Sequence, residues 1–152
     1  MKIYIKQATL ENVAQVADLF NSYRVFYKQA SDLDLAVKFI TERIKNQESV
    51  IFLAHDEEQN GLGFTQLYPI FSSVSAQRSW VLNDLYVSKD ARKIGVARTL
   101  MEAAKEFVLQ TGANGIALET AEDNTNAQSL YESLGYKRSA GFYNYFLSLE
   151  NA

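Results

Sequence analysis

Apolar residues along this chain are spaced in two ways, and the spacing predicts which stretches are strands and which are helices. Alternating apolar and polar residues, or a short apolar run, indicate a strand, whereas an apolar residue at every third or fourth position indicates a helix. These patterns predict strands at residues 3–7, 49–55, 62–72 and 79–87 and helices at residues 10–27, 33–44 and 94–111. Gly61 closes an acidic turn between the second and third of these strands, as in a β-hairpin.

The C-terminal part of the chain continues the same order of elements. It contains a predicted strand at 115–121, a short helix at 124–134 and two final strands around 136–138 and 142–149. Strands and helices in this order predict an α/β fold whose central sheet is mixed, mostly antiparallel and flanked by about four helices. No repeat or linker interrupts the pattern, so we expect one domain that spans residues 1–152.

Composition narrows the class of protein. Of the 152 residues, 47% are hydrophobic and 22% are charged, as in ordinary soluble globular proteins. The net charge of −3 gives no support to a nucleic-acid partner, and no apolar run is long enough to span a membrane. The absence of cysteine excludes disulfides, thiolate catalysis and zinc–thiolate sites. We therefore expect a cytoplasmic protein without a metal site, a membrane segment or a nucleic-acid partner.

The segment between the strand at 79–87 and the helix at 94–111 is typical of an anion-binding loop. A strand, a basic turn and a glycine before a helix bring backbone N–H groups together at the positive end of that helix. Gly95 has no Cβ, so the backbone can approach an anion closely. The side chain of Arg92 either pairs with a phosphate oxygen or is merely solvated. Taken alone, the pattern fits two alternatives about equally. One is a basic loop with a glycine before a helix, and the other is a site where a phosphate or pyrophosphate binds the backbone of Lys93, Ile94, Gly95, Val96, Ala97 and Arg98.

Two motifs together resemble those of the GNAT N-acetyltransferase superfamily. The first is Arg-x-x-Gly-x-Ala at residues 92–97, which is similar to the family's pyrophosphate loop. The second is Asn-x-x-Ala-x-x-Leu-Tyr-x-x-x-Gly-Tyr at residues 124–136, and the order and separation of the two also match. The resemblance is specific from Trp80 to Tyr136 and looser elsewhere. It implies the GNAT fold and an enzyme that moves an acetyl group from acetyl-CoA to an amine.

The resemblance also implies how acetyl-CoA is held. The strand at 79–87 is expected to splay away from the strand at 115–121. Its free backbone N–H and C=O groups then bind the acetyl and pantetheine part of the donor as they would bind another strand. That binding is assigned to the backbone of Leu85, Tyr86 and Val87. Asn124 and Ala127 lie in the second motif, where the family contacts the pantetheine arm, and Asn124 also suits an N-cap.

Tyr131 corresponds to the family's general acid, which protonates the departing thiolate. A phenol with a pKa of about 10 can donate to a thiolate with a pKa of about 8.5 when the two are in contact. Tyr131 also fits an apolar stripe on its helix, so periodicity alone favours a tyrosine of the core.

The general base is the least defined part of the predicted site. The run 82–87 is similar to one in spermidine/spermine acetyltransferases, but Asn83 stands where those enzymes have the glutamate that is the proposed base. Asp84 and Glu119 are the remaining acidic candidates. Strand alternation points Asp84 away from Asn83, so Asp84 either orients or attracts a cation or only satisfies a loop amide. His55, the only histidine, is interpreted as a surface residue beside an acidic turn.

The acceptor is expected to bind at the first two helices. Tyr23 and Tyr27 lie close in sequence to the carboxylates of Asp32 and Asp34, and such a lining favours a cationic amine. Asn83 is assigned to the same acceptor site. The alternative is that the aromatic residues only pack the helix onto the sheet.

We interpret the chain as an N-acetyltransferase that passes an acetyl group directly from acetyl-CoA to a primary amine, with a small or polyamine-like acceptor favoured. A covalent acetyl-enzyme is disfavoured because the chain has no cysteine and no recognisable serine triad. Two alternatives stay open: a GNAT-like module that binds CoA without catalysis, and an acetyltransferase of protein lysines or N-termini. A homodimer is expected, with the aromatic segment 142–146 as a candidate interface.

Overall fold

The computed structural model describes residues 1–150, and within that range the chain forms five strands, four α-helices and two short 3-10 helices. In chain order these are β1 Tyr4–Gln7, η1 Leu10–Asn12, α1 Val13–Phe26, α2 Leu33–Lys45, β2 Val50–His55, β3 Gly61–Ser72, β4 Gln77–Val87, η2 Lys89–Ala91, α3 Val96–Thr111, β5 Ile116–Ala117 and α4 Thr125–Ser133. The order of elements is therefore as predicted up to α4. By their contacts, the residues form two compact units, Met1–Glu119 and Thr120–Ala152.

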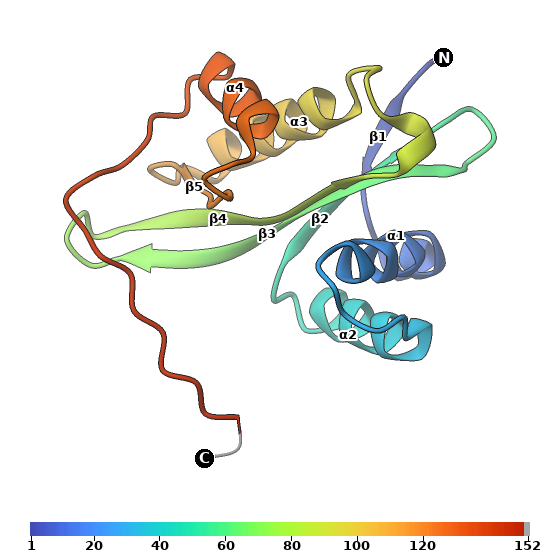
Figure 1. Cartoon of the computed structure of the whole chain (residues 1–152), viewed down its shortest axis with the longest axis horizontal. Coiled ribbons are helices and arrows are strands. Elements are labelled where there is room, and N and C mark those ends of the chain that lie inside the picture. The colour runs from blue at the N-terminus through green and yellow to red at the C-terminus, as the bar shows by residue number, and fades with distance from the viewer. Residues whose placement is uncertain (151–152) are drawn as a thin grey trace. The chain divides into compact units, whose positions relative to one another are not determined.

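The first unit is built on a five-stranded sheet in the order β1-β2-β3-β4-β5. The first four strands are antiparallel neighbours and β5 runs parallel to β4, which confirms the mixed, mostly antiparallel sheet. Helices α1 and α2 cover one face of this sheet and α3 covers the other (Figure 1). Because both faces are covered, β2 and the first half of β3 are buried almost without alternation.

Aromatic contacts identify which strand residues face which helices. On one face, Phe20 of α1 packs edge-on against Phe64 of β3, with ring centroids 6.2 Å apart. On the other face, Phe107 of α3 contacts Phe52 at 5.8 Å and Trp80 at 5.3 Å. The two faces of the sheet thus have separate aromatic cores.

A β-bulge interrupts β4 at Asn83. In the ladder with β3, Gln66 pairs with Asp84 but Leu67 pairs with Leu82, so Asn83 is the extra residue. A bulge of this kind shifts the alternation of side chains by one position in the residues that follow it.

The consequence is visible on either side of the bulge. Trp80 contacts Phe107 of α3, whereas Tyr86 contacts Tyr23 of α1, with ring centroids 6.2 Å apart. Two residues six positions apart in a regular strand would face the same helix. The extra residue at Asn83 therefore turns the last part of β4 toward the α1 face.

Strands β4 and β5 separate soon after they meet. Their pairing consists of Trp80 with Ile116 and Val81 with Ala117, after which β5 ends while β4 continues to Val87. The predicted strand at 115–121 is thus much shorter than expected. The early separation agrees with the splayed strand pair that the family resemblance implies.

The two final strands predicted around 136–138 and 142–149 are wrong. No residue in these ranges is in a strand, and the large side chains of the second range are highly exposed. Alternation and aromatic content give this segment strand propensity, but a strand also needs a neighbour for its backbone hydrogen bonds.

His55 is not the surface residue that the sequence predicted. It is only 6% exposed, its ring stacks on Tyr4 at 5.5 Å, and its Nδ1 lies 2.7 Å from the backbone oxygen of Asp56. His55 is covered because β2 lies between β1 and β3, where even the last residue of the strand has neighbours on both sides.

Gly63 is predicted to be intolerant of a side chain. A Cβ at this position would lie 2.6 Å from the backbone oxygen of Tyr86, so β4 would have to move. We expect Gly63→Ala to lower the free energy of unfolding by about 1–3 kcal/mol, as overpacking does. Gly115→Ala is the control, because a Cβ there meets nothing within 4 Å. Urea denaturation of both variants checks this, and equal stability would contradict it.

Candidate active site

The turn between β4 and α3 has the backbone conformation of an exposed glycine-containing loop. Lys93 and Gly95 both have positive φ angles, 68° and 90°, and Gly95 is the N-cap of α3. The first bond of the helix runs from the N–H of Thr99 to the oxygen of Gly95 at 3.0 Å, and the Thr99 hydroxyl donates to the same oxygen at 2.8 Å. The N–H groups of the first turn consequently have no acceptor within the helix.

This loop is anchored at both ends and exposed between them. Ala91 and Val96 are buried, which fixes the start and the end of the turn against the first unit. The residues between them are exposed, and farther on Ala97 is half-buried and Arg98 exposed. The backbone from Lys93 to Arg98 therefore presents a helix N-terminus to solvent, and an anion is the ligand that such a terminus favours.

The exposed side chain of Arg92 contacts the end of β4 and helix α1. Its Nε donates to the backbone oxygen of Val87 at 3.1 Å, at the end of β4. Its guanidinium lies 5.9 Å from the ring centroid of Phe26 and 5.8 Å from that of Tyr86, within the range of a cation–π contact. The positive charge of the loop is thus placed next to the free end of β4 and to helix α1.

Asp84 is the central charged residue of the site. It is 3% exposed, and the amide nitrogens of Gln66 and Asn83 both donate to its carboxylate, Asn83 at 2.8 Å. The hydroxyl of Tyr23 lies against the same carboxylate and donates to the backbone oxygen of Asn83 at 3.4 Å. The bulge explains this arrangement, since it turns Asp84 to the α1 face where Tyr23 lies.

Burial controls the ionisation of this cluster. Removal from water raises the pKa of Asp84, although the hydrogen bonds from Gln66, Asn83 and Tyr23 act in the opposite direction. Burial, followed by the charge of Asp84, raises the pKa of Tyr23 and raises the pKa of Tyr68 to about 12. The site therefore combines a carboxylate more basic than usual with two phenols that stay protonated.

The predicted geometry of Asp84 and Asn83 needs a correction. Alternation placed their side chains on opposite sides of the strand, yet the two are hydrogen-bonded. The bulge at Asn83 breaks the alternation at this point.

The predicted acceptor tyrosines form part of an aromatic cluster on α1. Tyr23 contacts Tyr27 at 5.0 Å and Phe64 at 5.8 Å, so it packs the helix onto the sheet as well as facing Asp84. Tyr27 and Phe26 are more than half exposed, and their rings are 5.3 Å apart. The cluster thus extends from a buried carboxylate to an exposed aromatic rim.

Glu119 is not joined to this cluster. It follows β5, is exposed, and within residues 1–150 no hydrogen bond or ion pair connects it with Asp84. Leu85, Tyr86 and Val87 are half-buried residues on the part of β4 that does not pair with β5.

The second unit contains the other predicted motif. Asn124 caps α4, because its Oδ1 accepts from the N–H of Ala127 at 3.2 Å. Tyr131 is half-buried on the same helix, and its ring centroid lies 6.2 Å from that of Tyr136.

Gln66 and Ser49 are site residues that the sequence analysis missed. Gln66 is fully buried, donates to Asp84 and accepts from the Ser49 hydroxyl at 2.7 Å. A glutamine inside a strand that is otherwise buried was the available signal, since buried polar side chains need partners.

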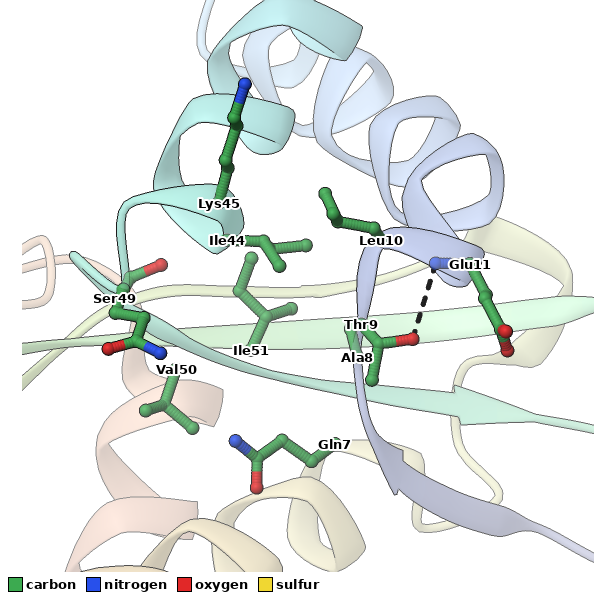
Figure 2. Close-up of a pocket in the computed structure, with 11 residues that line it drawn as sticks. Gln7, Ala8, Thr9, Leu10, Glu11, Ile44, Lys45, Ser49, Val50 and Ile51 are labelled. Carbon is green, nitrogen blue, oxygen red and sulfur yellow. Dashed lines mark hydrogen bonds between the residues drawn. The ribbon is translucent and has the colours of Figure 1, made fainter.

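Ser49 also lines a hollow of about 790 Å³ between the end of β1, the last turn of α2 and the start of β2 (Figure 2). None of the predicted site residues lines it, although Ser49 and Gln66 connect it with Asp84. Among the described residues no cluster of metal-ligating side chains occurs, and no helix has the length and apolar character needed to cross a membrane.

Comparison with known proteins gives consistent similarities. The model of the acetyltransferase (GNAT) family matches residues 13–136. A Bacillus subtilis protein designated the uncharacterized N-acetyltransferase YhfO is 48% identical over 95% of this chain and 97% of its own length. A Haemophilus influenzae protein designated a probable acetyltransferase is 35% identical over 90% of each chain. A crystal structure of a probable acetyltransferase is 45% identical, with a TM-score of 0.91 over 96% of this chain and 97% of its own.

The raised pKa of Asp84 predicts a pH dependence of stability. A buried acid with a raised pKa stabilises the folded state fully below its ordinary value of 3.8, and this contribution is lost as the pH rises toward the folded-state pKa. We therefore expect the stability of the wild type, relative to Asp84→Asn, to fall as the pH rises above 3.8. Urea denaturation at a series of pH values measures this difference.

Asp56 supplies a control of opposite sign. Hydrogen bonds from Asn60 lower the pKa of Asp56, so its contribution is lost as the pH falls. The stability of the wild type relative to Asp56→Asn should rise with pH. If both stability differences change in the same direction with pH, burial does not control the pKa of Asp84.

Proposed function

The chain belongs to the acetyltransferase (GNAT) family, and on this basis we propose that it transfers the acetyl group of acetyl-CoA to a primary amine. One observation carries the proposal: the uncovered end of β4 continues through an exposed, glycine-containing turn into the N-terminus of α3. The first part offers backbone hydrogen bonds to an amide-containing arm, and the second favours an anion. Acetyl-CoA has both groups in one molecule.

The donor is assigned to the backbone of this stretch. Leu85, Tyr86 and Val87 bind the acetyl and pantetheine part, and the N–H groups from Lys93 to Arg98 bind the diphosphate. Arg92 adds positive charge at the same edge, where Val87 holds it. Asn124 and Ala127 complete the pantetheine contacts, with Asn124 also capping α4.

Asp84 is the proposed general base. Its pKa is raised by burial, and a general base becomes more effective as its pKa approaches the working pH. Asn83 cannot take a proton, but it donates to Asp84 and thereby orients the carboxylate. Glu119 is the second candidate, because its exposed carboxylate is open to a substrate.

The acceptor is proposed to be a small cationic amine or a polyamine-like one. The rings of Tyr23 and Tyr27 lie in the cluster that ends at Asp84, and Phe26 and Tyr86 already contact the guanidinium of Arg92. Aromatic faces next to a carboxylate attract ammonium groups. Asn83 lies at the exposed surface of the same cluster.

The proposed reaction is a direct transfer within a ternary complex. The acceptor ammonium gives one proton to Asp84, and the free amine attacks the thioester carbonyl. The new C–N bond forms as the C–S bond breaks, the sulfur leaves as a thiolate, and the nitrogen loses its second proton to solvent to give the amide. Tyr131 protonates this thiolate, and both residues then recover their protonation states from solvent. The products are the acetylated amine, CoA and one proton.

The same proposal includes the domain organisation, the cellular location and the oligomeric state of the protein. We propose that residues 1–152 form one catalytic domain, because the family model matches residues 13–136 and so extends over parts of both compact units. We place the enzyme in the cytoplasm, where acetyl-CoA is a metabolite, and we expect it to act as a homodimer.

Two other functions are supported by specific features. A CoA-binding module without catalysis is favoured by Asn83. This residue stands where the spermidine/spermine acetyltransferases, which have a similar run of residues, have the glutamate that is their proposed base. An acetyltransferase of protein lysines or N-termini is favoured by the exposed rings of Phe26 and Tyr27, which suit a broad acceptor surface.

An amine panel tests the proposal. Release of free thiol from acetyl-CoA is measured with polyamines, amino acids, aminoglycosides and a lysine-containing peptide. We expect small cationic amines to raise the rate well above that without acceptor. CoA binding without release by any amine would establish the binding module, and release by the peptide alone would establish the protein acetyltransferase.

Tyr131→Phe is expected to lower turnover at saturating acetyl-CoA by about 100-fold, because general acid catalysis contributes at least that much. CoA affinity, measured by calorimetry, should change little. Tyr136→Phe is the matched control, since the buried hydroxyl of Tyr136 has no hydrogen-bond partner in the described part of the chain. Equal turnover of the two variants would remove Tyr131 from the mechanism.

A further inference from the structure

A line of polar side chains crosses three neighbouring strands of the sheet and ends at Asp84. Ser49 lies just before β2, Gln66 belongs to β3 and Asp84 belongs to β4. The Ser49 hydroxyl donates to Oε1 of Gln66 at 2.7 Å, and Nε2 of Gln66 donates to Oδ2 of Asp84. Gln66 is fully buried, whereas Ser49 is half-buried and lines the hollow in Figure 2. The line therefore leads from the edge of the hollow to the buried carboxylate.

The two ends of the Gln66 amide are not equivalent toward Asp84. The NH2 end only donates hydrogen bonds, and the oxygen only accepts them. An ionised carboxylate also only accepts, so the NH2 end stabilises it and the oxygen would repel it. The Ser49 hydroxyl donates to the oxygen, which favours the orientation that turns the NH2 end to Asp84. Without this hydroxyl, the buried oxygen would lose a partner.

We propose that Gln66 and Ser49 are positioning residues of the acceptor site: Gln66 fixes the carboxylate of Asp84 in its ionised form, and Ser49 fixes the amide of Gln66. This inference rests on the proposed role of Asp84 as the general base. Gln66 donates to Oδ2 and Asn83 donates to Oδ1, so both oxygens are held in place. Each carboxylate oxygen accepts about two hydrogen bonds, and the site can still receive a proton from an acceptor ammonium.

The other titratable groups around Asp84 do not supply an opposite charge. Tyr23 comes from α1 and Tyr68 from β3, and burial, followed by the charge of Asp84, raises the pKa of both phenols. Arg43 of α2, which acts on Tyr68, is paired with Glu48 at 3.1 Å. Within residues 1–150 no Lys or Arg forms an ion pair with Asp84. The ionised carboxylate thus depends on hydrogen bonds from neutral groups, and Gln66 contributes more than Asn83 or Tyr23 to lowering its pKa.

Titration of Asp84 in the resting protein tests the role of Gln66. Gln66→Met keeps the length of the side chain and removes the amide. Loss of a hydrogen bond to a charged group should raise the titration midpoint of Asp84 by about one pH unit, measured by carbon-13 NMR of labelled aspartate side chains.

Thr65→Val is the matched control for Gln66→Met. Thr65 is equally buried, but its hydroxyl donates to the backbone oxygen of Asp84 at 2.8 Å and not to the carboxylate. This variant loses a hydrogen bond of the same ladder and should keep the wild-type midpoint. An unchanged midpoint in Gln66→Met, or equal changes in both variants, overturns the proposal.

Two substitutions at Ser49 separate the hydroxyl from the packing. Ser49→Ala should raise the midpoint of Asp84 by a smaller amount, because Gln66 loses the partner that orients its amide. Ser49→Thr keeps a hydroxyl and should restore the wild-type midpoint. A midpoint that Ser49→Ala leaves unchanged, or that both variants change equally, overturns the role of Ser49.

Turnover as a function of pH separates this inference from the catalytic proposal. If Asp84 is the base, the acid limb of the turnover profile should move to higher pH in Gln66→Met by the same amount as the NMR midpoint. A changed NMR midpoint with an unchanged turnover profile would support the positioning contacts and remove Asp84 as the base. The NMR titration needs neither acetyl-CoA nor an amine, so its result does not depend on acetyl transfer.

Discussion

One extra residue in β4 decides which side chains the sheet presents to helix α1. Without the bulge at Asn83, Asp84 and Tyr86 would follow Trp80 onto the face covered by α3. With it, Asp84 lies among Gln66, Asn83 and Tyr23, and Tyr86 contacts the aromatic cluster of α1. The carboxylate and the rings that we assign to the acceptor therefore depend on a local irregularity of the backbone.

Burying a carboxylate is unfavourable, and the structure compensates for it only in part. Gln66 and Asn83 donate to Asp84, and Ser49 satisfies the oxygen of Gln66, so the polar groups of this cluster have partners. The pKa of Asp84 nevertheless stays above its ordinary value. A hydrophobic residue in its place would avoid this cost, so the retained charge is consistent with a role in proton transfer. The same strand then continues into the exposed turn at Gly95, which brings the proposed donor and acceptor sites onto one element.

The local backbone structure of the two motifs is what the sequence predicted well: Gly95 precedes α3 and Asn124 caps α4. Residues 92–97 and Asn124 have clear local signals, because a glycine before a helix and a capping asparagine act through neighbouring backbone atoms. The bulge at Asn83 has no such signal, since it depends on the register between two strands, and so the direction of Asp84 was wrong. Gln66 was missed for the same reason: its importance appears only when its partner across the ladder is known.

Strand propensity misled the prediction at the C-terminus. Residues 142–149 have the alternation of a strand, but alternation describes only side chains, whereas a strand is completed by a neighbour that the local sequence does not specify. His55 shows the converse, since its polar character predicted exposure while its place in β2 buries it.

The central claim is that the bulge delivers to the α1 face a carboxylate whose pKa is raised by burial. Carbon-13 NMR of labelled aspartate side chains, with Asp84 assigned by comparison with Asp84→Asn, measures that titration directly. The account predicts that Asp84 titrates above its ordinary value of 3.8 and that its signal shifts when a cationic amine binds. Titration at or below 3.8, with no response to any amine, would contradict it.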